Sequence, residues 1–314
     1  MTSHPHKLRL LDLPTLAMHS GRVYPNQAVT LAALAGQSGR RLPVGGLITS
    51  VLRLRRGRQL WVSRDGSTLL GVAGLRRRAG SSAWEIDYLL NTTSNDAFLL
   101  DLLDRVVATA GADGAHRIFL RVPDESDILN LALQHGFMVV TRETLYEAAP
   151  RPEARTSPRA RRRQRSDDHS LFQLYGHAVN QEVRWLTALA PSEWRATLEP
   201  LEDDSEEWIL PNPGDEGAAA FIRLAHGRAG SSVSILSEER SAAAAVDIAL
   251  RHGRPTRFRL LVAEYAIAQE RAAQEAGLQA TGRYALLVRP IAQRAHRLKL
   301  AEQAVEGSGR PVVQ

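Results

Sequence analysis

The sequence predicts an α/β protein built from two tandem units, and three observations support that fold class. Strand-like and helix-like segments alternate along most of the 314 residues, which is typical of sheets flanked by helices. The pentapeptide RAGSS occurs at residues 78–82 and again at 228–232, each time as a turn ahead of a short strand. Gly136 and Gly277 each stand where a helical pattern ends and a strand begins, the usual place of a C-terminal helix glycine.

In the first unit, the apolar pattern predicts two strands before RAGSS and a third directly after it. A helix, a strand, a second helix and a closing strand then follow. The segments are RQLWVSRDG, STLLGVAGLRR, WEIDYLL, AFLLDLLDRVVATAG, HRIFLRV, SDILNLALQHG and FMVVTRETLYEA.

The second unit repeats this order of elements, which makes an internal duplication the best interpretation. A pair of helices, broken at Pro191, is expected ahead of its strands, between Glu182 and Leu198. The later segments are EEWILPNPGDEG, AAAFIRLAHG, SSVSILS, SAAAAVDIALRHG, RFRLLVAEY, AIAQERAAQEAG and LQATGRYALLVRP.

We therefore expect an N-terminal domain over 1–150, a linker over 151–165, a C-terminal domain over 166–293, and a helix with a flexible tail over 294–314. The linker, RPEARTSPRARRRQR, contains seven arginines and one glutamate, so its charge of 7 − 1 = +6 accounts for the whole net charge of +6. Its prolines and its repelling charges predict an extended chain.

The positive linker suggests contact with nucleic acid or another polyanion, because arginines neutralise phosphates. The alternative is a solubilising tether between domains. The arginines that would make such a contact are Arg159, Arg161, Arg162, Arg163 and Arg165.

Composition excludes several classes of protein. Cysteine is absent, so disulfides, thiolate nucleophiles and zinc ribbons are excluded. The ten histidines are scattered, and we expect no metal site. No apolar run is long enough for a signal peptide or a membrane span, so we expect a cytoplasmic protein without membrane contact.

The order of elements resembles the GNAT superfamily of acetyl-CoA-dependent N-acyltransferases, with tandem GNAT proteins as the nearest architecture. The resemblance is clearest from Trp84 to Tyr146 and includes the helix exit at Gly136–Phe137. It implies mixed, twisted sheets in which two parallel strands splay apart to admit the pantetheine arm. It also implies acetyl-CoA or another acyl-CoA as cofactor, and an amine or a protein as acceptor.

The family holds the CoA diphosphate on a loop of pattern [Q/R]-x-x-G-x-[G/A] at the start of a helix, where backbone amides favour anions. In the first unit that pattern falls on a stretch without glycine or basic residues, in which an acidic cap would repel phosphate. In the second unit, Ser237–Ser241 again lacks glycine, although Arg240 is present. The cofactor-binding candidates of the first unit are Leu90, Asn91, Ser94, Asn95 and Asp96.

Two further features bear on catalysis. Glu85 and Asp87 alternate with apolar residues and share one face of their strand, where some family members carry a general base. A salt-bridged strand face is the alternative interpretation. The tyrosine that protonates the departing thiolate in the family, four residues before the helix-ending glycine, is replaced by Ala132 and Ala273.

Three functions follow as alternatives: an N-acyltransferase, a non-catalytic acetyltransferase-like scaffold, or a polyanion-binding protein. An open cleft between strands 84–90 and 117–122 would favour the enzyme. Side chains closing that cleft would favour the scaffold.

Overall fold

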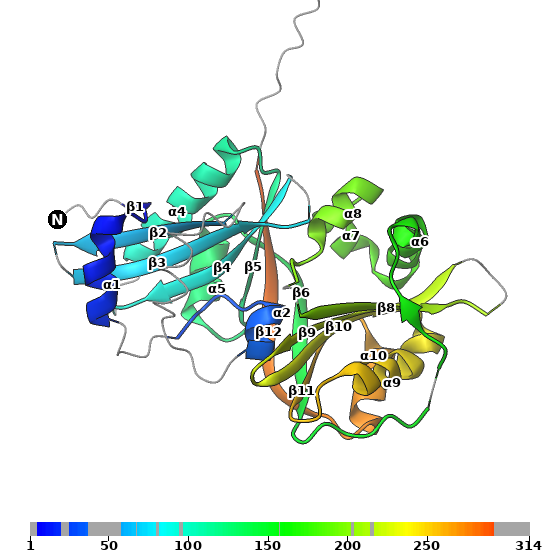
Figure 1. Ribbon diagram of the computed structural model, residues 1–314. Coiled ribbons are helices and arrows are strands. Elements are labelled where there is room, and N and C mark those ends of the chain that lie inside the picture. Colours follow the sequence, from blue (N-terminus) through cyan, green and yellow to red (C-terminus); the bar gives the residue numbers. More distant parts are fainter. Residues whose placement is uncertain are drawn as a thin grey trace, which may run out of the picture.

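The computed structural model describes residues 5–19, 25–36, 58–66, 68–79, 82–93, 97–156, 158–201, 204–213 and 217–291. The strands within these residues form one mixed sheet in the order β1-β2-β3-β4-β5-β12-β6-β11-β10-β9-β8-β7 (Figure 1). The predicted C-terminal helix and three of the predicted cofactor-loop residues, Ser94, Asn95 and Asp96, lie outside the described residues.

Every strand and helix predicted between RQLWVSRDG and LQATGRYALLVRP is present, so the predicted α/β fold class is confirmed. The first half contains β1 (His6–Lys7), η1 (Leu10–Asp12), α1 (Leu13–His19), α2 (Leu31–Gly36), β2 (Arg58–Asp65), β3 (Thr68–Arg77), β4 (Ala83–Asn91), α4 (Ala97–Ala112), β5 (Arg117–Pro123), α5 (Asp127–Gln134) and β6 (Met138–Ala148).

The second half repeats the arrangement from its first long strand onward. It contains β7 (Arg161–Arg162), η2 (Arg165–Asp167), α6 (Asp168–Ala178), α7 (Gln181–Thr187), α8 (Pro191–Thr197), β8 (Ser205–Pro211), β9 (Ala218–Gly227), β10 (Gly230–Ser237), η3 (Glu239–Ser241), α9 (Ala242–His252), β11 (Phe258–Ala263), α10 (Ile267–Glu275) and β12 (Gln279–Pro290).

The duplication extends further toward each N-terminus than the sequence pattern shows. The Asp12 carboxylate accepts a hydrogen bond from the Arg9 amide at 2.8 Å, and the Asp167 carboxylate accepts one from the Gln164 amide at 2.6 Å. Each aspartate thereby closes the short 3-10 turn that leads into the first helix of its half. The same local chemistry stands at the same place in both copies.

The two halves share their last strands. β12 pairs antiparallel with β5 of the first half, and β6 pairs antiparallel with β11 of the second half. β6 and β12 also pair with each other at the centre of the sheet (Figure 1). Within the described residues, one sheet therefore runs through both halves without a break.

Helices cover both faces of this sheet. In the first half, Trp84 and Ile86 of β4 pack in one core with Leu99 and Leu102 of α4. In the second half, α9 and α10 cover a comparable core. The other face carries α2, α6, α7 and α8 over β4, β6, β9 and β10. Within the described residues, no helix combines the length and the apolar character needed to cross a membrane.

Candidate functional site

Each half contains a V-shaped gap between its two central parallel strands. β4 pairs with β5 only from Ala83↔Arg117 to Glu85↔Phe119, although β4 continues to Asn91. β10 pairs with β11 only from Ser231↔Phe258 to Ser234↔Leu261, although β10 continues to Ser237. Beyond those pairs the strands diverge toward their carboxyl ends, where α/β proteins commonly bind ligands.

The chain's own segment 25–30 fills the first gap. The Gln27 amide donates to the Leu89 carbonyl of β4 at 2.8 Å, and the Val29 amide donates to the Arg121 carbonyl of β5 at 2.8 Å. The Asn26 side chain adds two bonds to β4, donating to the Asp87 carbonyl at 3.1 Å and accepting from the Leu89 amide at 2.9 Å. The segment therefore joins both diverging strands.

Side chains of this segment point to both sides of the sheet. Ala28 is 0% exposed and packs in the core beneath α4, whereas Val29 is 6% exposed and packs in the cluster that contains α2. The segment thus lies in the plane of the sheet. Backbone groups that an extended ligand would use are already bonded to protein, and the first cleft is closed.

The second gap opens into a cavity of about 440 Å³. No described segment pairs with β10 or β11 inside this gap, in contrast to the first half. A hydrogen bond of 3.1 Å from the Gln269 side-chain amide to the Ser237 hydroxyl spans the mouth of the V. The described residues that line the cavity are His177, Ala178, Ser237, Glu238, Glu239, Tyr265, Ala266, Ile267, Ala268 and Gln269.

Tyr265 lines this cavity, and Arg240 lies just outside the lining, next to Glu239. Burial, with a further contribution from Glu143, raises the pKa of the Tyr265 hydroxyl above its ordinary value, so the phenol stays neutral at physiological pH. Arg240 is exposed in η3, ahead of α9, and pairs with Glu238 at 2.7 Å. Residues 240–245, RSAAAA, fit the family loop pattern with alanine in the glycine positions. The family pattern is hard to find here from sequence, because alanine stands where the family carries glycine.

The predicted bases Glu85 and Asp87 share one face of β4, but both are buried. Arg76 and Arg78 bind Glu85, the latter at 2.8 Å, and Arg58 binds Asp87. Burial raises the pKa of Glu85, and the two guanidinium groups oppose that increase. This arrangement matches the alternative interpretation, a salt-bridged strand face, and neither carboxylate lines a described cavity.

Glu199, which follows α8 in the second half, binds two elements of the first half. Its carboxylate accepts from the Leu31 amide at 2.6 Å and from Arg121 of β5 at 3.0 Å. Burial alone would raise the pKa of Glu199, but Arg121 and neighbouring arginines outweigh it and lower the pKa to about 2. The segment that fills the first gap is therefore continuous with a helix held by a buried ion pair.

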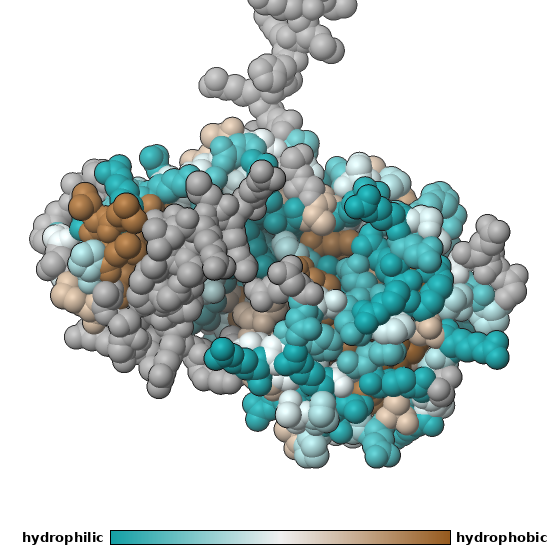
Figure 2. Space-filling model, viewed as in Figure 1, coloured by the Kyte–Doolittle hydropathy of each residue, from teal (hydrophilic) through white to brown (hydrophobic). Residues whose placement is uncertain are grey.

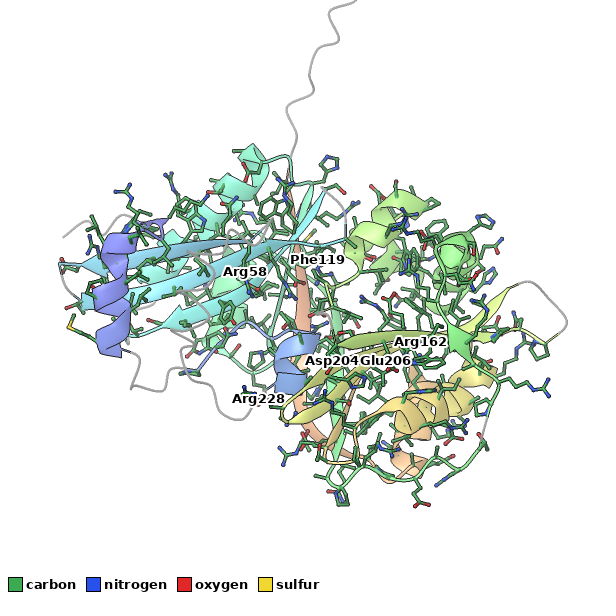
Figure 3. All side chains as sticks on the ribbon, viewed as in Figure 1. Arg58, Phe119, Arg162, Asp204, Glu206 and Arg228 are labelled. Atoms are coloured by element: carbon green, nitrogen blue, oxygen red, sulfur yellow. The ribbon has the colours of Figure 1, made fainter. Side chains whose placement is uncertain are left out.

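The linker is fixed to the second half. Two consecutive backbone amides, at residues 155 and 156, donate to Asp247 of α9 at 2.9 and 3.1 Å. Further along, Arg161 pairs with Asp167, Arg162 with Glu206, and Arg163 with both Asp168 and Glu207. Figure 3 shows Arg162 and Glu206 side by side at the β8 edge.

Two predicted polyanion contacts, Arg159 and Arg165, are exposed and form no ion pair among the described residues. Two predicted cofactor-loop residues, Leu90 and Asn91, end β4. Leu90 is buried and bridges Asn26, and the Asn91 side chain accepts from the Thr93 amide at 3.0 Å.

In the described part of the chain, no group of three or more His, Asp or Glu residues is arranged to hold a metal ion. The positions of the missing family tyrosine, Ala132 and Ala273, are both buried in helix–sheet cores.

Solved structures of other proteins share this arrangement of strands and helices. No family model and no curated protein matches the sequence. Among solved structures, a GCN5-related N-acetyltransferase from Sphaerobacter thermophilus aligns with a TM-score of 0.54 at 12% identity, covering 92% of this chain and 96% of that one. A putative acetyltransferase from Pyrococcus horikoshii aligns with a TM-score of 0.55 at 10% identity, covering 92% and 89%. The chain therefore has the fold of the GCN5-related N-acetyltransferases, in two tandem copies that share one sheet.

Proposed function

We propose that this protein is an acyl-CoA-dependent N-acyltransferase in which the C-terminal half alone binds the cofactor. One contrast supports the proposal: segment 25–30 occupies the gap between β4 and β5, whereas the gap between β10 and β11 opens into a cavity of about 440 Å³. The N-terminal half then serves as a non-catalytic partner, which holds its neighbour through the shared strands β6 and β12.

In the C-terminal half, the diverging part of β10 offers the pantetheine arm backbone groups that β11 leaves unpaired after Ser234. The exposed guanidinium of Arg240, in η3 ahead of α9, would pair with the diphosphate. The hydrogen bond between Gln269 and Ser237 crosses this path, so it must open when the arm enters.

The transfer makes one bond, breaks one bond and moves one proton. The neutral amine nitrogen forms a bond to the acyl carbon, the carbon–sulfur bond breaks, and the sulfur leaves as thiolate. The nitrogen loses one proton and the thiolate gains one, so amide and free CoA result. The neutral Tyr265 hydroxyl lines the cavity and is suited to donate a hydrogen bond to the departing sulfur.

Acetyl-CoA binding, measured by titration calorimetry, tests the proposal. Ile267 is exposed on the rim of the open cavity at the first position of α10, and Asp127 is the exposed first residue of α5 in the other half. We expect one acetyl-CoA per chain, loss of binding in Ile267→Trp, and unchanged binding in Asp127→Trp.

If the wild-type protein binds no acetyl-CoA, the proposal is wrong, and a non-catalytic acetyltransferase-like scaffold remains. The missing loop glycines and tyrosine support that second function. If Asp127→Trp removes binding and Ile267→Trp does not, the cofactor belongs to the N-terminal half and the assignment is reversed.

A further inference from the structure

A second cavity, of about 490 Å³, lies on the face of the sheet that carries α8, away from the cofactor cavity. Its volume is within the range of small-molecule sites. Figure 2 shows mainly hydrophilic side chains over this part of the second half. The described residues that line the cavity are Ala79, Arg162, Arg163, Arg195, Leu198, Glu199, Pro200, Leu201, Ser205, Glu207 and Arg223.

Three separate elements direct arginines to this cavity. Arg163 comes from the segment after β7, Arg195 from α8, and Arg223 from β9. Arg162 contributes to the lining, but its guanidinium group lies over the Trp208 ring, on the face of the sheet that carries α9. The lining also contains two carboxylates, so the three guanidinium groups on this face leave a formal charge of 3 − 2 = +1. The pKa of Glu199 lies at about 2, which keeps that carboxylate ionised at neutral pH. The lining therefore combines an ionised carboxylate with an excess of guanidinium groups.

The carboxylates in the lining already accept hydrogen bonds from the protein. Glu207 accepts from Arg223 at 2.8 Å and from Arg163 at 2.7 Å, and Glu199 is occupied by Leu31 and Arg121. Burial opposes ionisation of Glu207, but Arg223 and Arg163 outweigh it and hold its pKa below the ordinary value. These two acids have little capacity left for a ligand.

The arginines, in contrast, retain donors. A guanidinium group carries five N–H donors, and the Nε of Arg163 is buried without a hydrogen-bond partner. Arg195 is about half exposed, at 54%, and Asp168 is its one acidic partner among the described residues. Such forks match the planar oxygens of a carboxylate or a phosphate.

The cavity lies close to the gap between β10 and β11, where the acyl-CoA is proposed to bind. Arg223 stands directly opposite Ser234, which is the last residue of β10 paired with β11. Neighbouring strands lie roughly 5 Å apart, so the floor of the cavity is one strand away from the point where the cofactor gap begins. A small ligand anchored on these arginines can extend an amine toward that point.

We propose that this cavity binds the acceptor through an oxyanion, a carboxylate or a phosphate, carried by the same molecule as the reacting amine. That the ligand also carries the reacting amine rests on the proposed acyl transfer. The binding of the oxyanion itself does not depend on acyl-CoA.

The test uses two matched pairs of probes on the full-length protein without acyl-CoA. L-alanine is compared with L-alaninamide, and O-phosphoethanolamine with ethanolamine, because each pair differs in the oxyanion. The readout is the ¹⁵N–¹H resonance of the Arg163 Nε group, with sodium chloride added to keep ionic strength constant. We expect saturable shifts from at least one anionic probe and none from its neutralised partner.

Two variants identify the site. Arg195→Gln removes a half-exposed arginine of the lining, and it should weaken the effective probe about tenfold, the usual effect of losing one charge-assisted hydrogen bond. Arg159→Gln removes an exposed linker arginine outside the lining and should leave the titration unchanged.

Equal shifts from charged and neutral probes, or no saturable shift from either anionic probe, would contradict the inference. A probe that binds while acetyl-CoA does not would separate the two proposals: the oxyanion site stands and the acyltransferase fails. Acetyl-CoA binding without any probe binding gives the opposite result.

Discussion

Replacing Glu199 by glutamine removes the charge through which Leu31 of α2, Arg121 of β5 and the segment after α8 are held together. Glutamine keeps an oxygen that can accept from the Leu31 amide, so the substitution isolates the ionic part of the contact. We expect a marked loss of stability at neutral pH, because the buried guanidinium of Arg121 then keeps only Glu143 as an acidic partner.

The magnitude follows from the pKa. A carboxyl with a pKa of about 2, against an ordinary value of 4.5, contributes roughly 3 kcal/mol of stability at pH 7. A lowered pKa means that the contribution is complete above about pH 4.5 and decreases as the pH falls toward 2. At pH 3.5 roughly 2 kcal/mol remains.

Urea unfolding of the wild-type protein and Glu199→Gln, followed from pH 7 down to pH 3.5, measures this difference. The gap between the two free energies of unfolding should be constant above about pH 5 and should narrow below it. Glu153→Gln, at an exposed linker position, serves as the control and should match the wild type. A gap that is absent at pH 7, or that does not change with pH, would refute the reasoning.

Three further outcomes are expected. Asn26→Ala should destabilise the protein by about 1–3 kcal/mol in thermal unfolding, because it leaves the Asp87 carbonyl and the Leu89 amide of β4 without the Asn26 side chain. A second acetyl-CoA site in that variant would show that a ligand can enter the first gap. Tyr265→Phe should lower kcat about tenfold or more with little change in acetyl-CoA affinity, since the hydroxyl acts on the departing sulfur. An unchanged kcat would exclude that role. Arg159→Gln combined with Arg165→Gln should remove any salt-dependent binding to random-sequence DNA, and binding that survives would locate a polyanion site elsewhere.

The regular elements were predictable from sequence because their apolar periodicity is local. The alternation in WEIDYLL, for example, places Trp84 in the core and Glu85 on the opposite face, as the structure has them. The glycine helix ends were equally predictable, since Gly136 and Gly277 adopt φ values of +75° and +83° that favour glycine.

The closed first gap was not predictable in this way. The segment PNQAVT has no helix or strand period, and its partners Leu89 and Arg121 lie far along the chain. The sharing of β6 and β12 is likewise a pairing between distant segments, which local patterns do not encode. An open cleft and a cleft closed by side chains were the two alternatives that the sequence left, whereas in the structure a backbone segment closes the gap.

The contacts of the linker arginines were not predictable from charge either. Its seven arginines suggested an exposed polyanion surface, but Arg162 pairs with Glu206 of β8, and Arg163 faces a cavity and pairs with Glu207 of β8 and Asp168 of α6. Those acids, Asp168, Glu206 and Glu207, are visible in the sequence only as ordinary surface residues. Their spacing from the linker gave no sign of the pairing.

Hydrogen–deuterium exchange with and without acetyl-CoA tests most directly whether only the second gap receives cofactor. The account predicts slower exchange in the stretch from Ile235 to Ala245 and at the start of α10, with no change in β4, β5 or residues 25–30. Protection of Leu89 to Asn91, or faster exchange at residues 25–30 when acetyl-CoA is added, would contradict it.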